Sequence, residues 1–222
     1  MTVGAGAKIN YQTLEVNGLL PSWSAPGLSS QPKIVAFISP DDDLGMTSLL
    51  SDVAAAMCAL DKQAKVLHID GGFQAGDGLA AEDTALLPEM SGVADYLLVG
   101  LPSRPTPFAR HILLNCDLII VASSCKIEFL SATENVVKAL LYLGIDTEKV
   151  AGLLFDPEGI LSSASLADIK PYLGAGLGIE MAGVVSYEYG SGERMARDIK
   201  ALAQYIIPHD SPKLEPSFAR AG

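Results

Sequence analysis

Short, almost purely apolar runs alternate with amphipathic stretches along most of the chain. Each run is of strand length and holds few polar residues, which is typical of parallel strands that are covered on both faces. In the intervening stretches, apolar residues recur at the spacing of one helix face. The predicted strands cover residues 33–39, 65–70, 117–122, 150–155 and 181–185, and the predicted helices cover 47–61, 128–143, 165–173 and 193–206.

This alternation predicts an α/β fold: a three-layer domain with a mostly parallel sheet. Strand, turn, helix and strand within residues 33–70 predict a right-handed βαβ unit with a phosphate-type loop after its first strand. The domain is expected to extend over residues 33–207. Residues 1–32, punctuated by Gly, Ser and Pro, predict an N-terminal arm whose single tryptophan, Trp23, is a candidate anchor on the domain or on a partner. Residues 208–222 are assigned as a C-terminal tail.

Composition narrows the classes of function. Hydrophobic residues make up 49% of the chain and charged residues 18%, as expected for a core-rich globular protein. The formal net charge of −11 disfavours a sequence-independent nucleic-acid binder, because such proteins need clustered Lys and Arg. Three cysteines without CxxC spacing favour a reducing compartment over a disulfide framework. We therefore expect a cytoplasmic protein with no nucleic-acid partner.

The turn after the first strand reads Ser-Pro-Asp-Asp-Asp-Leu-Gly-Met-Thr-Ser over residues 39–48. It resembles, without a gap, the nucleotide-binding P-loop of the MinD/ParA superfamily, which is similar to Ser-Pro-Lys-Gly-Gly-Val-Gly-Lys-Thr-Thr. The residues that match are Ser39, Pro40, Gly45 and Thr47, with Ser48 as a mild replacement. The residues that replace two lysines and two glycines are Asp41, Met46, Asp42 and Asp43.

These replacements remove the chemistry that holds a nucleotide. In a P-loop, glycines let backbone N–H groups turn toward the phosphates, a lysine neutralises the phosphates, and Ser or Thr holds Mg²⁺. Here three carboxylates stand where the triphosphate would lie, and each like-charge contact at ~4 Å costs on the order of 1–4 kcal/mol. The lost glycines also remove the freedom to adopt positive φ. We therefore expect ATP and Mg²⁺ not to bind in the family's way, and the acidic run to be a solvated turn that favours the helix N-terminus.

A second motif follows the strand at residues 65–70. Residues 69–77 read Ile-Asp-Gly-Gly-Phe-Gln-Ala-Gly-Asp. They resemble Ile-Asp-Leu-Asp-Leu-Gln-Phe-Gly-Asp, which is found in the family branch that contains the pilus-assembly proteins CpaE and TadZ. Asp70 matches the first Asp of this motif. The second Asp, which in active members supports the attacking water and Mg²⁺, is replaced by Gly72.

Two alignments stay open for the next stretch. Residues 91–98 resemble a helix of the same branch, Gly-Leu-Ala-Asp-Leu-Leu. Residues 95–102 also resemble a later strand, Asp-Tyr-Val-Ile-Val-Asp-Leu-Pro, which would place Gly100 at its Mg²⁺-ligating Asp. In either case the stretch before Cys116 is shorter than in typical members, and we expect a strand–helix portion to be missing from it.

The base-reading position is altered as well. The strand at residues 150–155 resembles one that ends in the adenine-reading Asn, and here that position holds Asp156, whose carboxylate cannot donate as an amide does. The resemblance thus implies a vestigial nucleotide site that keeps Gly45, Thr47, Ser48 and Asp70 and is degenerate at Asp41, Asp42, Asp43, Met46, Gly72 and Asp156. We expect no catalytic residue and no cofactor. The histidines have no ligand spacing, so we also expect no metal site.

Resemblance to the CpaE/TadZ branch implies a non-catalytic localisation or assembly scaffold for pilus or secretion machinery, cytoplasmic or peripheral at the inner membrane. Its partners would be proteins: an envelope-associated assembly, or an active ATPase relative in a homo- or heterodimer. Family members dimerise face to face across the nucleotide, so a dimer here would need another interface. The alternative is an atypical ATPase or a relative of the capsular tyrosine kinases that regulates polysaccharide export. Those kinases need a Walker lysine and a tyrosine-rich tail, and neither Met46 nor the sequence after Ile207 provides them.

Overall fold

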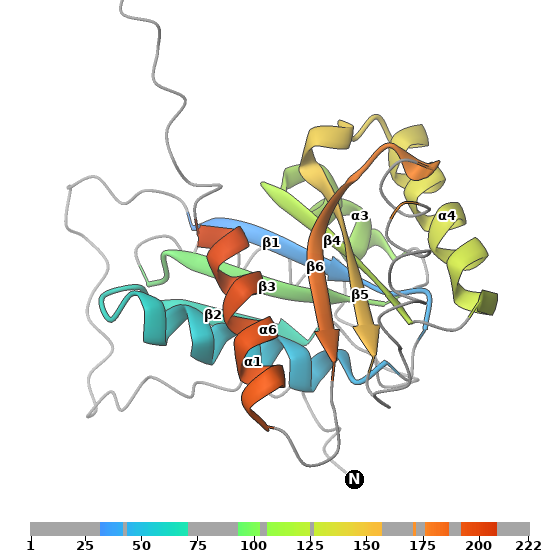
Figure 1. The fold of residues 1–222 in the computed structure, drawn as a ribbon. Helices are drawn as coiled ribbons and strands as arrows, with labels where there is room; N and C mark the ends of the chain where they lie inside the picture. The colour runs from blue at the N-terminus through green and yellow to red at the C-terminus, as the bar shows by residue number, and fades with distance from the viewer. Residues whose placement is uncertain are drawn as a thin grey trace, which may run out of the picture.

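The computed structural model describes residues 32–41, 44–70, 93–102, 106–124, 127–156, 171, 176–186 and 192–207. The strands in these ranges are β1 (Lys33–Ile38), β2 (Val66–Asp70), β3 (Tyr96–Leu101), β4 (Leu118–Ser124), β5 (Val150–Asp156) and β6 (Glu180–Ser186). The helices are α1 (Met46–Leu60), α3 (Pro107–Asn115), α4 (Ile127–Tyr142) and α6 (Gly192–Ile206), with a 3₁₀ turn η2 (Thr147–Lys149) before β5 (Figure 1).

The six strands form one sheet in the order β2-β3-β1-β4-β5-β6, and every neighbouring pair is parallel. β1 lies inside the sheet, where Val35 pairs with Leu98 of β3 and with Leu118 of β4. All residues of β3, β4 and β5 are buried, as expected for strands between two helical layers. β2 is an edge strand and is only partly buried. The predicted α/β fold with a parallel sheet is therefore confirmed.

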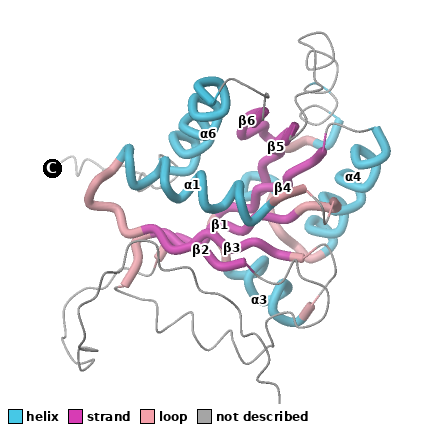
Figure 2. The backbone as a smooth tube through the Cα atoms, turned by 90° about the horizontal axis from the view of Figure 1, so that it is seen from below, coloured by secondary structure: helices cyan, strands magenta, loops and turns pink. Residues whose placement is uncertain are grey.

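Helices cover both faces of the sheet, with α1 and α6 on one face and α3 and α4 on the other (Figure 2). Because side chains alternate along a strand, Val35 and Phe37 of β1 pack in the core under α1 and α6. Ala36 and Ile38 pack in the second core, under α3 and α4. Successive strand residues thus contribute to one or the other of two cores, which is why the strands read as continuous apolar runs.

The predicted strands and helices that fall within the described residues all form, and their ends differ from the prediction by no more than two residues. The predicted helix at 165–173 lies outside the described residues except for Pro171, and so does the arm except for Pro32. The C-terminal tail, at residues 208–222, lies outside them too.

The stretch with two open alignments forms a strand. The helix interpretation of residues 91–98 is therefore wrong for the part that lies in β3, and the strand interpretation fits. Asp95 fixes the start of β3, because its N–H donates to the carbonyl of Lys65 at 2.8 Å and its carboxylate accepts from the N–H of Lys65 at 2.8 Å. The run from Tyr96 to Leu101 is buried between β1 and β2, where parallel pairing satisfies its backbone.

Helix α3 follows β3 in the stretch where we expected a strand–helix portion to be missing. The sequence pattern predicts no helix here, and α3 is a finding of the structure. In the structure Pro107 lies in the first turn of α3, where a helix does not use the backbone N–H. Thr106 caps the helix, with its hydroxyl accepting from the N–H of Ala109 at 3.0 Å.

No helix in the described part of the chain is long and apolar enough to cross a membrane.

The cap of α3 yields a test of the fold. Thr106→Ala removes the acceptor for the Ala109 N–H, and we expect the free energy of unfolding to fall by about 1 kcal/mol. Thr106→Ser keeps the hydroxyl and should retain most of the wild-type stability. Urea unfolding with an unchanged m-value would measure both. Equal stability of the two variants would show that the cap does not stabilise α3.

Candidate functional site

The strand order reverses direction at β1. The chain passes from β1 to β2 and β3 on one side, and then to β4, β5 and β6 on the other. In open α/β sheets, ligands bind in the crevice outside the carboxyl ends of the strands at such a switch point. The loop from Ser39 to Gly45 leaves β1 at this place, so the topology puts the loop whose sequence resembles a P-loop where a ligand site is expected.

The described part of this loop is folded against its own backbone. Ser39 is fully buried, and its hydroxyl accepts from the N–H of Asp41 at 3.0 Å. The carbonyl of Asp41 in turn accepts from the N–H of Leu44 at 3.3 Å, and the Leu44 side chain is buried in the core with α1. Asp42 and Asp43 lie outside the described residues. The loop therefore has an apolar anchor at Leu44 directly before the helix.

Gly45 is the N-cap residue of α1. Its backbone is left-handed, with φ 72° and ψ 33°, and its carbonyl accepts from the N–H groups of Ser48 and Leu49 at 3.1 and 3.2 Å. A residue with a Cβ would be strained by roughly 1–2 kcal/mol in this conformation. The backbone alone thus accounts for a glycine at this position, with or without a nucleotide.

Met46, at the position of the family's signature lysine, points into the protein. Its side chain is 3% exposed and belongs to the core beneath α1, together with Leu50 and Val53 on the same helix face. The next two residues, Thr47 and Ser48, are exposed at the carboxyl edge of the sheet. The first turn of α1 therefore presents two hydroxyls to this edge and turns residue 46 away from it.

Two of the residues that match the family motifs meet at this edge. The hydroxyl of Thr47 donates to Oδ2 of Asp70 at 2.5 Å, which joins the start of α1 to the end of β2. His68, two residues earlier on the edge strand, is half-buried; burial lowers its pKa, and the charge of Asp70 opposes that shift. His68 is thus a partly buried strand residue. Gly72 lies outside the described residues.

Asp156 lies at the end of β5, two strands from β1, and so roughly 10 Å from it across the sheet. It is 2% exposed, and its Oδ2 accepts from the hydroxyl of Ser186, its register partner on β6, at 3.4 Å. The structure therefore separates Asp156 from the Thr47–Asp70 contact. It pairs Asp156 with a serine that the sequence analysis did not single out, because cross-strand register cannot be read from one sequence.

Further buried hydroxyls lie between these two groups, at the end of β4. The hydroxyl of Ser123 donates to the carbonyl of Ser124 at 3.1 Å, and Oγ1 of Thr133 on α4 lies 2.8 Å from Ser123 Oγ. Together with Ser39, Asp156 and Ser186 they form what we call the polar belt of the carboxyl edge: Ser39, Ser123, Ser124, Thr133, Asp156 and Ser186. Within the described residues, every buried side-chain nitrogen or oxygen has a hydrogen-bond partner. The buried polar side chains of the belt thus have hydrogen-bond partners within the protein.

Across the described ranges, no group of three or more His, Cys, Asp or Glu residues is placed to hold a metal ion. Cys116 at the end of α3 is buried, and burial raises the pKa of its thiol to about 12. A thiol with this pKa stays protonated near neutral pH and does not act as a nucleophile.

A parallel α/β sheet with a loop-to-helix turn at its switch point defines the class of fold, that of the P-loop ATPases of the MinD and ParA type. Solved structures bear this out. MinD from Aquifex aeolicus superposes with a TM-score of 0.61 at 13% identity, over 81% of this chain and 98% of that one. A ParA family ATPase from Chlorobium tepidum TLS gives 0.59 at 12% identity, over 78% and 98%.

A plasmid partition protein from Borrelia burgdorferi bound to AMPPNP gives a TM-score of 0.58 at 13% identity, over 81% of this chain and 99% of that one. Neither a family model nor a curated protein matches the sequence. At these identities the likeness shows the fold: this chain has the MinD/ParA-type fold over nearly the full length of those proteins.

The burial of Met46 can be tested directly. Met46→Lys would place an ammonium group in the core or force α1 to shift, and we expect the free energy of unfolding to fall by about 2–4 kcal/mol. Met46→Leu keeps an apolar side chain of similar volume and should cost less than about 1.5 kcal/mol. Urea unfolding of both variants provides the comparison. If the lysine variant is as stable as the leucine variant, residue 46 is able to face the carboxyl edge.

Proposed function

We propose that this protein uses the MinD/ParA-type fold as a non-catalytic localisation or assembly scaffold, and that the carboxyl edge of its sheet does not bind Mg²⁺-ATP. The observation that carries the proposal is Met46, which replaces the phosphate-binding lysine and is packed into the core. The residues present at this edge decide whether a nucleotide fits.

The phosphate position offers no cation. The thioether of Met46 carries no charge to offset the β and γ phosphates. The Met46 side chain packs in the hydrophobic core beneath α1. Asp41 stands where the loop of an ATPase carries its first lysine, with its N–H held by Ser39. A carboxylate about 4 Å from a phosphate oxygen costs on the order of 1–4 kcal/mol per contact. The electrostatics of the loop therefore oppose a triphosphate.

The magnesium position keeps a hydroxyl and a carboxylate, and the misfit continues at the base position. The hydroxyl of Thr47, the group that holds Mg²⁺ in a P-loop, donates to the carboxylate of Asp70. At the base-reading position, Asp156 is 2% exposed and engaged by Ser186, and a carboxylate has no proton to donate to a ring nitrogen of adenine. Because the phosphate and base positions do not fit ATP, we assign no reaction to this edge.

The role as a scaffold rests on what the chain keeps. The described residues form a hydrophobic core on each face of the sheet, while the positions that would face a nucleotide are changed at several separate places. A solved MinC:MinD complex, which superposes with a TM-score of 0.57 at 15% identity, illustrates that this fold also serves as a platform for another protein. The likeness of residues 69–77 to the CpaE/TadZ motif favours pilus or secretion machinery at the inner face of the envelope as the setting.

A dimer of this chain, with itself or with an active ATPase relative, would then form without a nucleotide sandwiched in its interface. The rival function, an atypical ATPase or a kinase-like regulator of polysaccharide export, needs a cation for the phosphates. The structure places none of the described lysines or arginines in the loop after β1.

Turnover separates the scaffold from its enzymatic rival. We expect the purified protein, incubated with radiolabelled ATP and Mg²⁺, to release no phosphate above the blank and to acquire no label on its tyrosines. A MinD-type ATPase assayed in parallel controls for the conditions. Catalytic phosphate release that tracks with the protein through purification would replace the scaffold with the ATPase.

Localisation in cells provides a second test. Thr47→Ala removes the hydroxyl that an active P-loop needs for Mg²⁺, whereas Thr47→Ser retains it. We expect fluorescent fusions of both variants to localise as the wild type does, because the proposed scaffold does not use that hydroxyl for a metal. Loss of localisation in Thr47→Ala alone, at equal protein level, would show that a nucleotide cycle is needed.

A further inference from the structure

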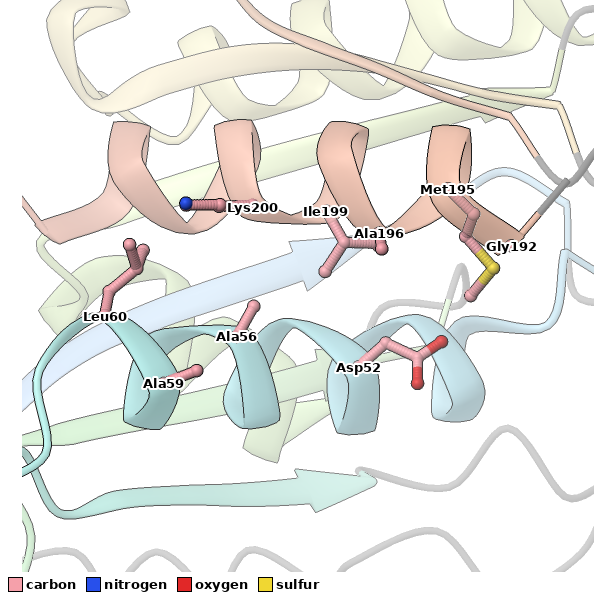
Figure 3. A pocket seen from close by; sticks show the side chains of 9 residues that line it. All are labelled: Asp52, Ala56, Ala59, Leu60, Gly192, Met195, Ala196, Ile199 and Lys200. Carbon is pink, nitrogen blue, oxygen red and sulfur yellow. The ribbon is translucent and has the colours of Figure 1, made fainter.

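A groove of about 420 Å³ lies between α1 and α6, on the outer side of the helical layer that these two helices form (Figure 3). Small side chains open it, because Ala56 and Ala59 of α1 and Ala196 of α6 line it, with Ala56 pointing toward α6. Ile199 and Leu60 add apolar surface along its length. This surface is well suited to an apolar side chain that inserts from outside.

The groove is not part of the carboxyl edge. Its lining runs along the two helices, from Asp52 to Leu60 of α1 and from Gly192 to Lys200 of α6, whereas the loop after β1 precedes the first turn of α1. Asp52 lies toward one end of the groove and Lys200 toward the other, so charged groups occur near its ends and apolar groups between them (Figure 3). An occupant with an apolar centre and no charge of its own fits this arrangement.

The start of β1, to which the N-terminal arm is attached, lies near this groove. Lys33, the first residue of β1, is buried, and its ammonium donates to the carbonyl of Ile206 in the last turn of α6 at 3.1 Å. The arm therefore joins the domain beside the carboxyl end of α6. From Ile206, the groove begins six residues back, at Lys200, and reaches Gly192, fourteen residues back, which corresponds to about 9–21 Å along the helix.

The arm is long enough to reach it. Trp23 precedes Lys33 by ten residues, and ten extended residues span at most roughly 33–36 Å. That reach exceeds the distance to the far end of the groove, so Trp23 can arrive there without full extension of the chain.

The arm also has the right chemistry. Residues 19–27 read Leu-Leu-Pro-Ser-Trp-Ser-Ala-Pro-Gly, a stretch without a charge that includes the single tryptophan of the protein. The tail that leaves the same end of α6 carries Asp210, Lys213 and Glu215 within its first eight residues and fits an apolar groove less well.

We propose that the groove between α1 and α6 is the binding site for the chain's own residues 19–27, with the indole of Trp23 inserted between Ala56 and Ala196. Aromatic side chains bury a large apolar area while their polar edge stays near solvent, which suits an open groove. The docked arm covers this face of the domain, so a protein partner that uses α1 and α6 must first displace it.

The single tryptophan makes the proposal measurable by fluorescence. We expect the wild-type emission to be blue-shifted, and its quenching by acrylamide to be weaker than in the unfolded protein. Ala56→Glu places a charge in the groove and should shift the emission to longer wavelength and raise quenching to the level of the unfolded protein. Ala55→Glu, on an exposed position of α1 outside the groove, is the matched control and should leave both values unchanged.

A second pair of variants covers the case in which Ala56→Glu fails to fold. Ala196→Glu lies in the groove on α6, and Ala201→Glu lies on an exposed position of the same helix outside it. Circular dichroism establishes that each variant is folded before its emission is compared. Only the groove variants should release the tryptophan.

Four results would overturn the proposal. The first is a wild-type tryptophan that is as accessible to acrylamide as in the unfolded protein. The second is an equal response of groove and control variants. The third is a blue shift that is lost on dilution, which would assign the groove to the arm of another copy. Truncation after Ile207 should leave the fluorescence unchanged, and a tryptophan released by that truncation would likewise contradict docking of the arm alone.

Discussion

The parallel pairing of β1 with β3 on one side and with β4 on the other is the constraint on which the rest of this structure depends. Val35 and Phe37 enter one core and Ala36 and Ile38 the other, so β1 ties the two helical layers together. Side chains at the amino edge fix the registers: Asp117 accepts from the N–H of Ile34 at 2.8 Å at the start of β4. Because the strand order reverses at β1, the same pairing also places the loop after β1 at the carboxyl edge of the sheet, at the switch point.

That constraint explains how the site can change while the fold persists. The four residues of β1 that fill the two cores are apolar and buried, and the strand ends before the loop that would hold a phosphate. Met46 adds to the core under α1, and within the polar belt of the carboxyl edge Thr133 pairs with Ser123 and Ser186 pairs with Asp156. Buried polar groups that already have partners need no ligand to satisfy them. The fold of the domain therefore rests on contacts among its own residues.

The sequence predicts most of the fold because two-sided burial leaves a readable pattern: β4 and β5 are continuous apolar runs, and α1 and α6 show helical spacing. It leaves β3 ambiguous, since a short apolar run after Ser91 fits a helix or a strand until a neighbouring strand is known. It gives no sign of α3, because Pro107 looks like a loop residue unless Thr106 is recognised as its cap. The lost lysine is visible at residue 46, but the burial of Met46 depends on the helix that turns it inward. The pairing of Asp156 with Ser186 depends on a register that one sequence does not contain.

The central claim is that this domain keeps a P-loop ATPase fold and does not use it to bind ATP. Isothermal titration calorimetry of the full chain with ATP in the presence of Mg²⁺ tests that claim most directly, with a MinD-type ATPase titrated under the same conditions. The account predicts no heat beyond that of dilution. Stoichiometric binding of Mg²⁺-ATP with micromolar affinity would contradict it.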